Sequence, residues 1–198
     1  HIGALVKALA LTPDAAQRIP LYFSKELTNV RSRGYIPPLG YLTMNHTLES
    51  LADAIASIGK DDFYRQFARY LRTCISYDNI IVIVFQGTET PVVLYRDTYG
   101  PDVFRFLSEQ YLPAAYLLDP VYHFHLNRGK PGLYRLLEVA PDQFFRSRYY
   151  KWYYGRIGIT DEISVLLPIG EAITFTISMG KDSSSGQLFS SAAEEGLR

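Results

Sequence analysis

Apolar residues recur with a helical period in the first part of this chain. Residues 45–58 place them every three or four positions, which predicts an amphipathic helix that stops at Gly59. Residues 63–74 repeat the spacing after Asp61, a suitable N-cap, and predict a second helix. Both segments therefore need a partner surface to cover one apolar face.

Other apolar runs have the pattern of strands. Ile80–Phe85 is rich in β-branched residues and has no polar face, which predicts a central strand covered on both sides. Residues 91–95 return after a turn and predict an antiparallel neighbour. Residues 163–167 and 173–179 flank a tight turn at Gly170-Glu171 and predict a hairpin.

Between these strands the pattern returns to helices. Residues 101–112 predict one helix, and Asp119-Pro120 starts another that runs to about residue 127, with Asp119 as its N-cap. Residues 142–154 predict a third helix, whose end, Tyr149–Tyr154, holds five aromatic residues in six positions. A Gly-x-x-Gly break then leads to the hairpin, so we expect aromatic side chains and acids to meet there.

The two ends of the chain differ from its middle. Residues 1–44 predict short helices interrupted by prolines and form a helical N-terminal extension; the chain begins with His1 rather than Met, so we expect its true N-terminus to lie further upstream. Ser191 and Glu194 have capping-box spacing, which predicts a helix from about residue 192. The sequence stops about two turns later, and a helix so short suggests that something follows it.

Composition narrows the classes of function. Lys plus Arg and Asp plus Glu both number 20, so there is no global basic field for nucleic acid. Sixteen Tyr and 11 Phe favour a pocket or an interface. Cys74 is the single cysteine, which excludes a disulfide framework and suits a reducing cytoplasm. No apolar run reaches the 18 or so residues of a membrane span.

Catalytic and metal chemistry find little support. There is no Gly-x-Ser-x-Gly motif, and Cys74 lies on the apolar face of a predicted helix, where an inert thiol is expected. His123 and His125 are two positions apart, so on a helix they point about 200° apart and cannot share a metal ion. We expect no metal, no cofactor and no enzyme activity.

Two acidic positions are candidates for binding. Asp119 either caps its helix alone or also accepts a hydrogen bond from a ligand, and a carboxylate has acceptor capacity for both. Asp161 and Glu162 are adjacent on a predicted strand and therefore face opposite sides. They are either surface carboxylates paired with Arg156 or Lys151, or one of them serves a ligand.

The last predicted strand has a polar face. Thr174, Thr176 and Ser178 alternate with apolar residues. This face is either exposed to solvent or forms the polar floor of a pocket. The sequence leaves both open.

Several short motifs in order resemble the N-terminal sensor domain of LuxR-type helix-turn-helix transcriptional regulators. The resemblance covers residues 45–198. It implies an α+β fold, an α-β-α sandwich of the GAF/PAS-like kind with a central, mainly antiparallel sheet. It also implies a ligand between the sheet and one helical layer, and a DNA-binding domain beyond Arg198. The motifs are Phe63–Phe85, Tyr116–Tyr122, Pro131–Tyr134, Phe145–Ile163, and Phe189-Ser190 with Glu194.

The resemblance assigns a role to one acid and leaves the ligand open. In the autoinducer-binding branch of the family, the Asp of the Asp-Pro motif binds the ligand amide, and Asp119 matches it. That branch has a Trp 13 residues earlier, where this chain has Phe106, and another Trp whose nearest counterpart here is Tyr134. The acyl-homoserine lactones of that branch are therefore not assigned to this chain.

The resulting hypothesis is the sensing domain of a cytoplasmic, homodimeric regulator that binds a small molecule at residues 45–198 and DNA only through a later domain. One alternative is a GAF-like dimerisation module whose cavity is filled by its own side chains. Another is a small-molecule enzyme. The predicted ligand-binding residues are Phe85, Phe106, Tyr116, Asp119, Tyr122, Tyr134, Tyr149, Trp152, Tyr153, Glu162 and Thr174.

Overall fold

The computed structural model describes residues 39–100 and 103–190, with side chains from residue 46 onward. The chain divides between Cys74 and Ile75 into two compact units, which we call the helical unit and the sheet unit. The predicted helices within residues 1–38, and the one from about residue 192, lie outside the described residues.

The helical unit contains α3 (Leu39–Ala56) and α4 (Phe63–Cys74), which pack against each other. The connection passes through Gly59, whose φ of +78° is one that residues with a Cβ rarely adopt. The α4 helix buries Phe63, Phe67 and Leu71, one turn apart, as its apolar spacing predicts. Both predicted helices are present, although α3 begins before residue 45.

The sheet unit is built on five strands, all antiparallel, in the order β2-β1-β5-β4-β3. The α+β class and the antiparallel central sheet predicted from the sequence are therefore confirmed. The β4–β5 hairpin turns at Gly170, with φ +63°. The strands are β1 (Asn79–Gln86), β2 (Val92–Thr98), β3 (Gly132–Arg135), β4 (Ile159–Ile169) and β5 (Ile173–Asp182).

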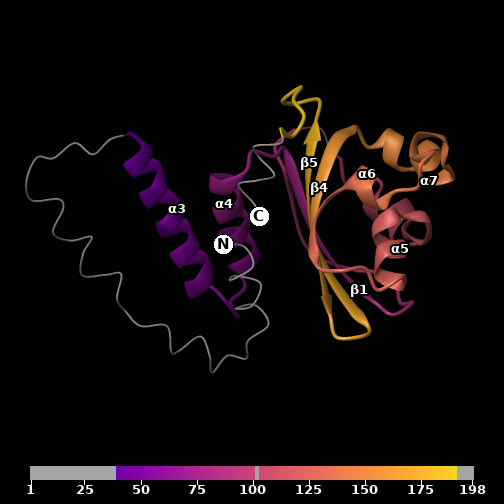
Figure 1. Ribbon diagram of the computed structural model, residues 1–198, viewed down its shortest axis with the longest axis horizontal. Helices are drawn as coiled ribbons and strands as arrows, with labels where there is room; N and C mark the ends of the chain where they lie inside the picture. Colours follow the sequence, from indigo (N-terminus) through magenta and orange to yellow (C-terminus); the bar gives the residue numbers. More distant parts are fainter. Residues whose placement is uncertain (1–38, 101–102, 191–198) are drawn as a thin grey trace, which may run out of the picture. The chain divides into compact units, whose positions relative to one another are not determined.

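A layer of short helices covers one face of this sheet (Figure 1). Three are α-helical: α5 (Pro120–Leu126), α6 (Leu136–Val139) and α7 (Arg148–Trp152). The others are a π-helical turn, η1 (Leu107–Tyr111), and three 3₁₀ turns, η2 (Ala115–Leu118), η3 (Phe144–Arg146) and η4 (Tyr154–Arg156).

Two of the predicted helices are wrong in length. The continuous helix over 142–154 is split into η3, α7 and the start of η4, because Ser147 is extended (ψ 157°) and its Oγ accepts from the N–H of Tyr150 to begin a new helix. The helix over 101–112 is reduced to η1, after which Pro113 prevents continuation.

The two faces of the sheet differ in polarity. Toward the helical layer, Thr176 of β5 lies between Ile83 of β1 and Leu166 of β4. Thr174 and Thr176 are buried, so the polar face of β5 lies inside the unit rather than in solvent. The other face carries buried aliphatic side chains, at Ile80, Val82, Ile163, Ile177 and Met179.

His125 ties α5 to the sheet. Its Nε2 donates to the carbonyl oxygen of Gly87 at 2.9 Å, and its Nδ1 is 2.8 Å from Oγ1 of Thr174. A carbonyl can only accept, so the hydrogen of the neutral ring is on Nε2 and Nδ1 accepts from Thr174. His123 is exposed whereas His125 is buried, and no cluster of metal-ligating side chains occurs among the described residues.

Replacing His125 with alanine is expected to lower the free energy of unfolding by about 2–4 kcal/mol. The change removes a buried ring and leaves the Thr174 hydroxyl and the Gly87 carbonyl without their partner. Urea unfolding followed by circular dichroism measures the effect. His123→Ala, on the same helix, is the matched control and should stay within about 0.5 kcal/mol of the parent. Equal losses in both variants would contradict the anchoring role of His125.

Candidate functional site

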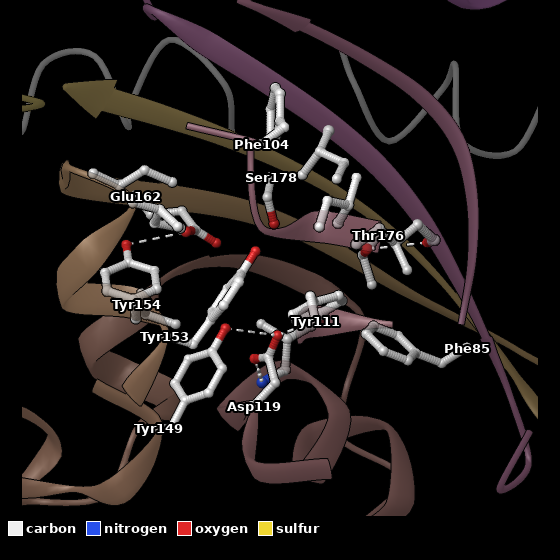
Figure 2. A pocket seen from close by; sticks show the side chains of 17 residues that line it. Phe85, Phe104, Tyr111, Asp119, Tyr149, Tyr153, Tyr154, Glu162, Thr176 and Ser178 are labelled. Carbon is white, nitrogen blue, oxygen red and sulfur yellow. Dashed lines mark hydrogen bonds between the residues drawn. The ribbon is translucent and has the colours of Figure 1, made fainter. Parts of the chain in front are cut away.

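A cavity of about 50 Å³ lies within the sheet unit, between the sheet and its helical layer (Figure 2). Since about 10–15 Å³ on this measure accommodates one water, it has room for a few waters or a very small molecule. Its walls are mostly apolar and aromatic. The lining residues are Ile81, Ile83, Phe85, Phe104, Leu107, Tyr111, Asp119, Val121, Leu136, Tyr149, Tyr153, Tyr154, Ile157, Ile159, Glu162, Thr176 and Ser178.

Asp119 lies at the helical wall and has two structural roles. Its Oδ1 accepts from the backbone N–H of Val121 at 2.8 Å and so caps α5. Pro120, at the first helical position, has a φ that already suits the first turn. Its Oδ2 accepts from the hydroxyls of Tyr111, at 2.6 Å, and Tyr149, at 3.2 Å. The carboxyl therefore joins η1, α5 and α7 at one point.

Burial dominates the electrostatics of this group. It raises the pKa of Asp119, although hydrogen bonds from Tyr111, Val121 and Tyr149 act in the opposite direction. Burial and the neighbouring Asp119 charge raise the pKa of Tyr111 and of Tyr149 well above the usual value. Both phenols therefore remain neutral donors.

Glu162 reaches the cavity from β4. Its Oε2 accepts from the Tyr154 hydroxyl at 3.1 Å, and its Oε1 accepts from Oγ of Ser164 at 3.2 Å. Ser164 is in turn 2.7 Å from Oγ of Ser178 on β5. Burial, reinforced by Asp119, raises the pKa of Glu162 to about 7. The adjacent Asp161 instead pairs with Arg135 at 2.9 Å, so the two acids diverge.

Tyr153 differs from the other tyrosines of the cavity. Its side chain is 4% exposed, and its hydroxyl points into the space between the helical wall and the sheet (Figure 2). Within the described part of the chain, this hydroxyl makes no hydrogen bond. Burial, with the charges of Asp119 and Glu162, raises its pKa, so it is a neutral hydroxyl free to bond a guest.

The architecture is similar to that of a solved ligand-binding domain, that of VqsR from Pseudomonas aeruginosa. The TM-score is 0.59 and the identity 26%, over 75% of this chain and 85% of that chain. VqsR is a LuxR-family regulator.

This chain has the fold of a LuxR-type sensor domain.

Two other solved structures are similar to this chain at lower scores. The N-acylhomoserine-lactone-dependent LuxR-family factor CepR2 from Burkholderia cenocepacia has a TM-score of 0.49 and 11% identity, over 77% of this chain and 87% of its own. SdiA from Escherichia coli has a TM-score of 0.48 and 15% identity, over 78% of this chain and 63% of its own. No protein-family model and no curated protein matches the sequence.

Over the described residues, no helix has the length and apolarity needed to cross a membrane.

The sheet unit brings five of the predicted ligand-binding residues together at the cavity: Phe85, Asp119, Tyr149, Tyr153 and Glu162. Three other predicted residues lie just behind its wall. Tyr116 and Tyr122 are buried and pack edge to face at 5.1 Å, and Tyr122 contacts Phe85 at 5.7 Å. Thr174 is bonded to His125 and does not line the space.

The remaining three predicted residues lie away from the cavity. The ring of Phe106 is flanked by the guanidinium groups of Arg105, at 4.6 Å, and Arg156, at 4.5 Å. Tyr134 donates to the carbonyl oxygen of Lys130. Trp152 is 54% exposed and lines an outer hollow of about 300 Å³. Tyr153 lines both this hollow and the inner cavity.

Several cavity residues are absent from the predicted set. Thr176 and Ser178 share a strand face with Thr174; the alternation of β5 indicates all three as a possible pocket floor, but the predicted set includes only Thr174. Tyr154 follows Tyr153 in the aromatic segment and would have required the break between α7 and η4 to be known. Tyr111 is placed by a π-helical turn, for which the sequence carries no signal.

Proposed function

We propose that this sensor domain binds a small molecule in the cavity beside Asp119 and Glu162, as part of a LuxR-type regulator. Binding would then control DNA binding by a later domain of a homodimeric, cytoplasmic protein. The supporting observation is the Tyr153 hydroxyl, which makes no hydrogen bond to the described residues and points into the cavity that Asp119 and Glu162 also line. A guest with a hydrogen-bonding group could bond to this hydroxyl, which can both donate and accept.

The volume restricts what can bind. Pockets for drug-sized ligands measure about 300–1,000 Å³, and this cavity measures about 50 Å³. The ring of Tyr153 packs against the rings of Tyr111 and Tyr149 at centroid distances of 5.3 and 5.7 Å. These rings occupy space that a larger ligand would need. The site therefore fits a compact ligand.

The same packing favours a second candidate, an interaction module whose cavity its own tyrosines fill. An enzyme has less support, because the similar solved structures are domains of regulators. Ligand binding and self-filling differ in one measurable way. A ligand that binds only the folded state raises the melting temperature, and a filled core gains nothing from added compounds.

A thermal-shift screen of small amines, lactones and aromatic acids tests the proposal. A ligand at 100 times its Kd is expected to add about 2.7 kcal/mol, which corresponds to about 5–10 °C for a chain of this size. Ser178→Leu, which places a larger side chain in the cavity, should abolish the shift. Trp152→Ala, in the outer hollow, should retain it. A shift that survives Ser178→Leu, or no shift with any class, would refute a sensing role for this cavity.

A further inference from the structure

The cavity has an excess of hydrogen-bond acceptors over donors. Asp119 and Glu162 have lone pairs beyond the bonds they already accept. The Thr176 hydroxyl already donates to the carbonyl oxygen of Ile83, and Ser178 is engaged with Ser164. The Tyr153 hydroxyl is thus the one donor left uncommitted among the lining residues, all of which the structure describes. A guest must therefore bring donors of its own.

The charge of the cavity walls also favours a guest that carries donors, and a positively charged one in particular. None of the lining residues, which all fall within the described part of the chain, is Lys, Arg or His. A carboxylate or phosphate guest would face two acids in a low-dielectric site with no counter-charge, which is strongly unfavourable. A positively charged guest would supply the missing counter-charge.

The aromatic rings suit a cation as well. Tyr149 lies 5.7 Å from Tyr153 and 5.9 Å from Tyr154 between ring centroids, and Tyr153 lies 5.3 Å from Tyr111. Clustered tyrosine rings attract cations through the negative faces of their π systems, most strongly where water is excluded.

We infer that the cavity selects a compact organic cation, a small alkylammonium group that donates to the carboxylates of Asp119 and Glu162 and to the hydroxyl oxygen of Tyr153. This inference rests on the proposed sensing function and specifies its ligand class. An ammonium group carries three N–H donors and no acceptor, which matches walls rich in acceptors.

Proton release provides a signature of this binding mode. Glu162 interacts with Asp119 and with the hydroxyls of Ser164 and Ser178, while Asp161 is turned away to Arg135. The tyrosines that interact with Glu162 are Tyr111, Tyr149, Tyr153 and Tyr154. Without a counter-cation, Glu162 is partly protonated near neutral pH. A bound cation favours the ionised carboxylate, so binding should release up to one proton and tighten as the pH rises from 6 to 8.

Calorimetric titration of the full chain with n-alkylammonium chlorides, methyl to butyl, tests the inference. The matching n-alcohols and n-carboxylates are the ligand controls. We expect only the ammonium series to bind, with affinity at pH 8 several-fold higher than at pH 6, and with proton release measured from two buffers of different ionisation enthalpy. Equal binding of alcohols or carboxylates, or no proton release, would overturn the inference, and neither result depends on a variant that must fold.

Variants then locate the site. Glu162→Gln should weaken ammonium binding by about tenfold or more, and Tyr153→Phe by a smaller factor. Glu171→Gln, in the exposed β4–β5 turn, should leave the affinity unchanged. If Glu162→Gln binds ammonium as tightly as the parent, the inference is wrong.

Stabilisation by a lactone or an aromatic acid, lost in Ser178→Leu, would reject the cation while preserving the sensing function. No binding by any class would reject both.

Discussion

Replacing Asp119 with alanine is expected to lower the free energy of unfolding by about 3 kcal/mol. The change removes the N-cap of α5, which is worth about 1 kcal/mol, and leaves the buried hydroxyls of Tyr111 and Tyr149 without their acceptor, at about 1–3 kcal/mol each. Relief from burying a carboxylate offsets part of this loss. Urea unfolding, followed by circular dichroism and by tyrosine fluorescence, measures the difference.

Asp119→Asn is the matched variant. The amide oxygen can still accept from the N–H of Val121, and its NH₂ can donate to one of the two tyrosine hydroxyls. The expected loss is therefore below about 1.5 kcal/mol, since caps of Asn and Asp are nearly equivalent. A loss with asparagine as large as with alanine would show that the hydrogen-bond geometry around Asp119 is not what stabilises this part of the domain.

The second large effect is expected from Glu162→Gln, and it depends on pH. The folded-state pKa of Glu162 is raised from 4.5 to about 7, so between these values the folded protein holds a proton that the unfolded chain has lost. The contribution of Glu162 to stability is therefore present in full below about pH 4.5 and is lost as the pH rises through 7. At 1.36 kcal/mol for each pKa unit, the loss is about 3 kcal/mol at most.

Glutamine cannot ionise, so the variant should escape this loss. We expect Glu162→Gln to match the parent near pH 4 and to exceed its free energy of unfolding by about 1–3 kcal/mol at pH 8. Urea unfolding of both proteins from pH 4 to pH 8 gives the difference directly. Glu171→Gln should show no such divergence. A Glu162→Gln difference that is constant across this range would mean that Glu162 titrates normally in the folded protein.

These two acids also show how far the sequence could predict the site. Asp119-Pro120 is a local helix-start signal, so both the cap and its position were predictable. The alternation of β4 predicted that Asp161 and Glu162 diverge, although not which one faces inward, because that depends on the register with β5 and on an irregularity between Ile159 and Asp161. The central strand β1 was predictable because its apolar run has a single reasonable interpretation.

What the sequence could not predict are contacts between distant segments. Residues 181–187 have the composition of a mobile loop, yet Lys181 and Asp182 belong to β5 and are 2% and 1% exposed. Their partners come from about a hundred positions earlier: Lys181 donates to Ser76 at 3.2 Å and lies 3.8 Å from Asp78. Local composition carries no information about such pairing.

The two walls of the cavity differ in how readily they can change conformation. The strands β1, β5 and β4 each have a hydrogen-bonded neighbour on both sides, so displacing any of them disrupts two ladders at once. The facing wall consists of pieces three to five residues long, η1, η3, α7 and η4, each too short to hold its shape alone. Tyr111 belongs to η1, Tyr149 to α7 and Tyr154 to η4. A larger guest would therefore have to be accommodated by movement of η1, η3, α7 and η4, while β1, β5 and β4 keep their positions.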